Sequence, residues 1–156
     1  MKRCRRRLVW VALWMAVIFL FSAQTSQRSK ELSGAVMEQL TTQQTDAPSA
    51  EETPEQEFLH TLIRKGAHFA EYAVLSMLVA YAIWDLDLPK KVRWLLPVAV
   101  SALYAVTDEV HQYFVPGRAC RLGDMAIDTL GAISGMAFLA ALVWLWKKIG
   151  NKKACC

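Results

Sequence analysis

The stretch from Asp108 to Asp128 constrains the fold of this chain more than any other segment, because it places many polar side chains between apolar ones. It holds four acidic residues, one histidine, one glutamine and two arginines within 21 residues. The apolar segment before it, residues 94–107, would form roughly 21 Å of helix, whereas a hydrocarbon core is about 30 Å thick. A helix that crosses a membrane here must therefore carry polar side chains into or near the lipid.

Charged groups in lipid need partners or water. An unpaired charge at the centre of a bilayer costs roughly 2.5 to 3.5 kcal/mol, and somewhat less near the interface. Polar residues inside a membrane segment are therefore functional candidates, and we expect Asp108, Glu109, His111 and Gln112 to belong to a site.

The apolar residues are concentrated in long runs. Of the 156 residues, 54% are hydrophobic. Long apolar runs, in place of the alternating pattern of a soluble domain, are typical of membrane-spanning helices. We therefore predict an all-α integral membrane four-helix bundle. The four runs are Leu8 to Ala23, Ala67 to Trp84, Trp94 to about Phe114, and Met125 to Trp146.

The basic residues set the expected topology. The net charge is +4, but the lysines and arginines lie mostly at the ends of apolar runs, which argues against nucleic acid as a partner. Twelve of the 18 fall in residues 2–7, 90–93 and 147–153. Because cytoplasmic loops carry the excess of basic residues, we predict a multi-pass membrane protein with both termini in the cytoplasm. Three of the four cysteines would then face a reducing compartment, so no disulfide framework is expected.

The chain divides into five predicted segments. Phe21-Ser22-Ala23 matches a signal-peptide cleavage site poorly, because phenylalanine stands where a small residue is needed, so we expect a retained signal anchor. Thr53 and Pro54 indicate a helix start, as N-cap and first helical residue. The segments are a basic cytoplasmic head (1–7), transmembrane helix 1 (8–23), an extracytoplasmic polar linker (24–53), a core with transmembrane helices 2–4 (54–146) and a basic cytoplasmic tail (147–156).

Helix 2 carries a polar face near its predicted outer end. Arg64, His68 and Glu71 are spaced four and three residues apart, which places them on one side of a helix, with Tyr72 beside them. Glu71 lies roughly 20 Å of helix before the inner end at Trp84, hence inside the outer leaflet.

Helices 3 and 4 bring further polar residues to the same depth. Asp108, His111 and Gln112 share one face of helix 3, whereas Glu109 points about a quarter turn away. Asp124 is a candidate N-cap of helix 4, and Asp128 follows one turn deeper. Because neighbouring helices run antiparallel, we expect one outward-facing cluster. Its predicted members are Arg64, Lys65, His68, Glu71, Tyr72, Asp108, Glu109, His111, Gln112, Arg118, Asp124 and Asp128.

Three roles are open for this cluster. The first is structural, because the side chains can satisfy one another and fix helix register. The second is a divalent metal site, in which Zn²⁺ or Mn²⁺ would activate water to hydrolyse an ester or amide. The third is recognition of an anionic ligand, since arginine suits phosphate and carboxylate groups. The candidate metal ligands are His68, Glu71, Asp108, His111 and Asp128, and the candidate anion-binding residues are Arg64, Lys65, Arg118 and Arg121.

Several motifs together resemble the VanZ-like family. They are RKGAHFAEY at residues 64–72, LYA at 103–105, DEVHQYFVPGR at 108–118, Asp124, and DTLG at 128–131, with FSAQ at 21–24. The resemblance covers most of the chain except the linker and the tails. It implies a small bacterial multi-span membrane protein, in a family named for a member that lowers susceptibility to the glycopeptide teicoplanin. It also implies a cell-envelope role at the outer face of the cytoplasmic membrane.

The residues and the resemblance together favour one function. We expect the cluster to bind or alter a cell-envelope component, and so to lower sensitivity to glycopeptide or other envelope-targeting antibiotics. The alternatives are a metal-assisted membrane hydrolase and a structural or scaffold membrane protein. The expected partners are membrane lipid and a cell-wall precursor or another anionic envelope ligand.

Overall fold

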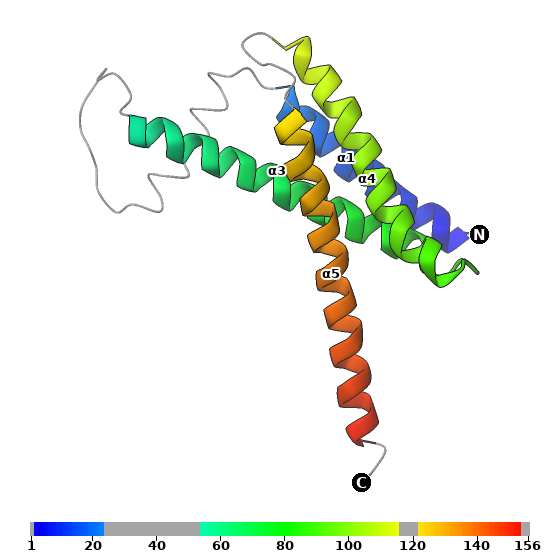
Figure 1. Ribbon diagram of the computed structural model, residues 1–156. Coiled ribbons are helices and arrows are strands. Elements are labelled where there is room, and N and C mark those ends of the chain that lie inside the picture. Colours follow the sequence, from blue (N-terminus) through cyan, green and yellow to red (C-terminus); the bar gives the residue numbers. More distant parts are fainter. Residues whose placement is uncertain (1, 24–53, 116–121, 154–156) are drawn as a thin grey trace.

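The computed structural model describes residues 2–23, 54–115 and 122–153. Within these ranges the chain forms four α-helices and no strand, which confirms the predicted all-α class and the number of helices. The predicted linker and the loop that bears Arg118 and Arg121 lie outside the described residues. The helices are α1 (Lys2–Ser22), α3 (Pro54–Ile83), α4 (Lys90–Tyr113) and α5 (Leu122–Lys153) (Figure 1).

Several helices extend beyond the apolar runs. α1 begins at Lys2 and so includes most of the basic head, and α5 continues to Lys153 in the basic tail. α3 begins at Pro54, as predicted, because proline lacks an N–H that would have no partner in the first turn. Pro97 lies inside α4, where its ring removes one helical hydrogen bond.

α3 makes the most extensive contacts of the four described helices, and these contacts reach α1, α4 and α5. α5 crosses α3 at a steep angle, and its C-terminal part extends away from the other helices (Figure 1). The four helices are therefore not aligned along their whole lengths as in a regular bundle. The crossing depends on Gly131 and Gly135, because a Cβ at either position would overlap the carbonyl oxygen of Phe69 or Ala73.

The apolar core lies between α1, α3 and α4. Two hydrogen bonds tie α1 to the other two helices at this level. Trp14 Nε1 donates to the carbonyl oxygen of Glu71 at 2.9 Å, and the Tyr104 hydroxyl donates to that of Met15 at 2.6 Å. The buried core residues are Val11, Ile18, Tyr72, Leu75, Val79, Ala82 and Ala105.

Large apolar side chains remain exposed on all four helices, among them Leu20, Leu62, Leu103 and Trp146. Exposed apolar surface of this extent marks contact with lipid or with a partner. Two of the described segments are long and apolar enough to cross a membrane, Phe58–Ile83 and Leu122–Ile149. The four-span arrangement and the cytoplasmic termini stay predictions.

Candidate functional site

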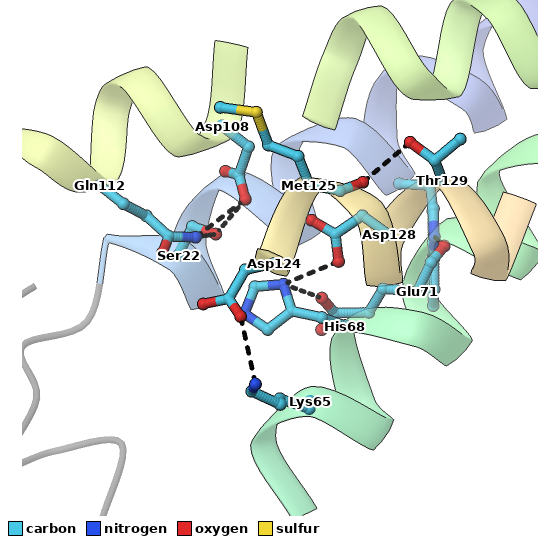
Figure 2. Close-up of polar contacts among 11 residues, drawn as sticks. Ser22, Lys65, His68, Glu71, Asp108, Gln112, Asp124, Met125, Asp128 and Thr129 are labelled. Atoms are coloured by element: carbon cyan, nitrogen blue, oxygen red, sulfur yellow. Dashed lines mark hydrogen bonds and ion pairs between the residues drawn. The ribbon is translucent and has the colours of Figure 1, made fainter. Parts of the chain in front are cut away.

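The first part of the candidate site is a buried hydrogen-bond network between α1 and α4. The Ser22 hydroxyl donates to Asp108 Oδ2 at 2.6 Å, and Gln112 Nε2 donates to Ser22 Oγ and to Asp108 Oδ2 at 3.1 Å each (Figure 2). Asp108 and Gln112 are four residues apart on α4, so they share the face that meets the end of α1. All three side chains are buried, so one carboxylate oxygen accepts two bonds away from water.

The second part joins α3 to the start of α5. His68 Nδ1 lies 3.8 Å from Glu71 Oε2 and 4.0 Å from Asp128 Oδ1 (Figure 2). One turn earlier on α3, Lys65 Nζ lies 3.5 Å from Asp124 Oδ1. Residues 65, 68 and 71 repeat every three positions, so they follow one face of α3 toward α5. His68 is thus placed between acids of two helices.

Asp124 is not the N-cap of α5, and that prediction was wrong. The helix begins at Leu122, so Asp124 lies within the first turn. A negative charge there is favoured by the partial positive charge of the helix N-terminus, and here also by Lys65. Asp124 therefore stabilises the N-terminus of α5 from within the first turn, where an N-cap would stabilise it from outside the helix.

The two parts meet around Tyr72, whose side chain is fully buried. It interacts electrostatically with Asp108, Asp128 and Glu71, and Asp128 interacts with Asp108 and Glu109. Glu109, a predicted member of the cluster, is also buried, although it stands about a quarter turn from Asp108 on α4. We call the assembled residues the polar cluster. Its described members are Ser22, Lys65, His68, Glu71, Tyr72, Asp108, Glu109, Gln112, Asp124 and Asp128.

Several buried atoms of the polar cluster have no hydrogen-bond partner among the described residues. They are both carboxylate oxygens of Asp128, Oδ1 of Asp108 and the hydroxyl of Tyr72. Leaving a buried polar group without a partner costs roughly 1 to 3 kcal/mol, and folded proteins satisfy most such groups. These oxygens are therefore open to hydrogen bonds from a ligand or water.

Some predicted members make no side-chain hydrogen bond or ion pair with the polar cluster among the residues that the structure describes. The His111 ring packs on Phe19, with ring centroids 4.3 Å apart. Arg64 forms no ion pair with the cluster residues that the structure describes, and Arg118 lies outside them. Ser22 belongs to the polar cluster, although the predicted set lacked it. Only its place in the FSAQ motif pointed to it, because its partner is far away in the sequence.

The described geometry does not favour the metal site among the three open roles. In the parts of the chain that the structure describes, no group of three or more His, Cys, Asp or Glu side chains is arranged to hold a metal ion. The two candidate imidazoles are used differently, since His68 lies between acids and His111 packs on an aromatic ring. Metal-assisted hydrolysis therefore has no geometric basis in these ranges.

Hydrogen-bond acceptors dominate the described cluster. Its acids outnumber its basic groups, and one of the basic groups, Lys65, is already paired with Asp124. Carboxylates attract hydrogen-bond donors and positive charge, so the described residues suit a donor-bearing ligand better than an anion. The acids are Glu71, Asp108, Glu109, Asp124 and Asp128, and the basic groups are Lys65 and His68.

Comparison with known proteins supplies one match. A family model described as VanZ/LLP1 matches residues 7–145, which cover most of the chain and parts of all four helices. The match confirms the resemblance found in the motifs. Neither the comparison with curated proteins nor the comparison with solved structures found a match.

Proposed function

The chain belongs to the VanZ/LLP1 family, and on that premise we propose that it is a membrane protein whose polar cluster binds a cell-envelope component. The family is associated with antibiotic resistance, so binding would lower sensitivity to glycopeptides or other envelope-targeting antibiotics. In this proposal the chain crosses the bacterial cytoplasmic membrane four times, with both termini inside and the cluster near the outer leaflet.

The main support for the proposal is that Asp128 is buried without a hydrogen-bond partner among the described residues. Its side chain is 2% exposed, and the nearest basic group among the described residues, His68 Nδ1, is 4.0 Å away, too far for a hydrogen bond. It lies within a segment apolar enough to cross a membrane. An ionisable residue at such a place is expensive to keep and marks a functional site by default. A purely structural cluster would be expected to satisfy this carboxylate internally.

The unsatisfied acceptors indicate which part of the ligand enters the cluster. Asp128 and Asp108 together offer three oxygens without described hydrogen-bond partners, and the Tyr72 hydroxyl lies in the same cluster. A hydroxyl, amide or ammonium group would satisfy them. We therefore propose that a donor-bearing portion of an envelope component, such as a cell-wall precursor, binds here.

A susceptibility assay tests this function. A host that lacks its own copy would express wild type, Asp128→Asn, Glu71→Gln or Asp87→Asn at equal levels, and growth would be measured against teicoplanin. The first two substitutions remove acids of the cluster. Asp87→Asn makes the same chemical change as Asp128→Asn at an exposed position outside the cluster, so it serves as the matched control.

We expect Asp128→Asn to return susceptibility toward that of the host without the protein. Loss of one hydrogen bond to a charged group is worth roughly 1.5 to 3 kcal/mol, which is about a tenfold or greater loss of affinity. Glu71→Gln should act in the same direction, and Asp87→Asn should protect like wild type. If folded Asp128→Asn protects the host as fully as wild type does, the polar cluster is not the site of this function.

A further inference from the structure

A second candidate site lies at the opposite end of α1 from the polar cluster. Arg6, Arg7 and Trp10 of α1 and Tyr81 of α3 line a cavity of about 240 Å³. Sites for drug-sized ligands measure roughly 300 to 1,000 Å³, so this cavity suits a small head group. We propose that it binds the phosphate group of an anionic membrane lipid.

Arg7 is held in position before any ligand arrives. Its Nη1 forms a 2.9 Å salt bridge with Asp85 Oδ2 and donates a 3.1 Å hydrogen bond to the carbonyl oxygen of Tyr81. Its guanidinium carbon lies 4.4 Å from the centroid of the Tyr81 ring. These three contacts fix the side chain, so little conformational entropy is lost when it binds an anion. One nitrogen makes both polar contacts, and the remaining N–H groups are left for a ligand.

The charges around the cavity leave a positive excess. Asp85 neutralises Arg7, whereas Arg6 is exposed and makes no ion pair among the residues that the structure describes. The two arginines and one aspartate thus sum to one positive charge, which matches the single negative charge of a phosphodiester. Arginine also presents a donor fork that fits phosphate oxygens.

The aromatic residues favour a lipid over a free phosphate ion. The Trp10 and Tyr81 side chains are 60% and 52% exposed, although both are large and partly apolar. Tryptophan and tyrosine are enriched at the level of lipid head groups. Farther along α1, Leu13 continues the exposed apolar surface, where an acyl chain would lie. A ligand with an anionic head and an apolar tail fits both the arginine-lined cavity and the apolar surface beyond it.

The cavity and the polar cluster can be tested separately. Arg7 and Ser22 stand near the two ends of α1, roughly 22 Å apart along the helix. A substitution at the cavity therefore leaves the network around Asp108 in place. Lipid binding here does not depend on the proposed binding of an envelope component.

Native mass spectrometry of the full chain would test the proposal. The protein would be released from mixed micelles that contain phosphatidylglycerol or phosphatidylcholine, as wild type, Arg6→Gln or Arg5→Gln. Arg5 is also exposed and one position earlier, but it does not line the cavity, so its variant is a matched control for charge. Inorganic phosphate at millimolar concentration would be added in a second arm. Circular dichroism would verify that each variant is helical.

We expect wild type to retain phosphatidylglycerol in preference to phosphatidylcholine. Arg6→Gln should reduce that retention about tenfold, because a charge-assisted bond to phosphate is lost, and Arg5→Gln should change it less than about twofold. Inorganic phosphate should leave the bound lipid in place. Equal losses in both variants would reduce the effect to general attraction between charges and overturn the site. Displacement of the lipid by inorganic phosphate would overturn the choice of lipid.

Discussion

The Ser22 hydroxyl lies 2.6 Å from Asp108 Oδ2, although 86 residues separate them in the sequence. This contact joins the end of α1 to the last turns of α4, next to the acids contributed by α3 and α5. A carboxylate buried among apolar helices needs such donors, because water is not available to it. The end of α1 is therefore a part of the polar cluster.

Ser22→Ala should destabilise the protein. It removes one of two donors to Asp108 Oδ2 and leaves Gln112 alone to satisfy that oxygen. We expect a loss of roughly 1 to 3 kcal/mol in the free energy of unfolding, measured by thermal denaturation in detergent. Thr107→Ala also removes a hydroxyl, but an exposed one that bonds within its own helix, so its effect should stay within about 0.5 kcal/mol. Equal effects would contradict the importance of the Ser22 contact.

Gly131→Ala should disturb the crossing of α3 and α5. The added Cβ would overlap the carbonyl oxygen of Phe69, so one backbone must shift. Overpacking of this kind typically costs 1 to 3 kcal/mol, and we expect a lower melting temperature. Gly66→Ala is the control, because nothing lies within 4 Å of its Cβ and alanine favours a helix by roughly 0.5 to 1 kcal/mol. If Gly131→Ala is as stable as wild type, the close contact between α3 and α5 does not lie at Gly131.

The helices could be predicted because their signals are local. Apolar runs mark all four, and the Thr-Pro pair locates the start of α3 at Pro54. The motif spacing also placed Asp108 with Gln112, and His68 with Glu71, because residues three or four apart share a helix face. Helix ends were less certain. The first turn of α5 includes Asp124, since Leu122 and Gly123 are already helical.

The contacts between helices could not be predicted, because they depend on crossing angles. The spacing of Gly131 and Gly135 four residues apart indicates that a neighbouring helix approaches closely, but it does not indicate that the partner is α3. The steep crossing then brings Asp128 beside His68 while the end of α5 projects away (Figure 1). Ser22 pairs with Asp108 only because α1 ends at that level, which no spacing in the sequence encodes.

Tyr104→Phe should loosen α4 from α1. The Tyr104 hydroxyl donates a 2.6 Å hydrogen bond to the carbonyl oxygen of Met15, and the substitution leaves that oxygen without this donor. We expect a loss of about 0.5 to 1.5 kcal/mol in stability, measured by thermal unfolding. Tyr113→Phe makes the same change at a side chain that is 68% exposed, so it should be nearly neutral. If both variants have the same melting temperature, the hydrogen bond to Met15 does not stabilise the contact between α1 and α4.

Asp128→Asn should increase the stability of the protein and reduce its protective function. A buried carboxylate without a hydrogen bond destabilises the folded state, and its 4.0 Å contact with His68 is too long to offset this cost. Replacing this buried ionisable group by an amide should therefore raise the melting temperature by a few degrees, as expected from about 1 kcal/mol. The same substitution should reduce protection against teicoplanin.

Opposite changes in stability and protection are typical of a binding residue, because a functional site keeps groups that the fold alone would not favour. A structural residue gives the other pattern, in which stability and protection fall together. Thermal denaturation and susceptibility of the same Asp128→Asn protein, beside Asp87→Asn as the exposed control, distinguish the two. A lower melting temperature for Asp128→Asn would show that the carboxylate supports the fold and would contradict its role in binding.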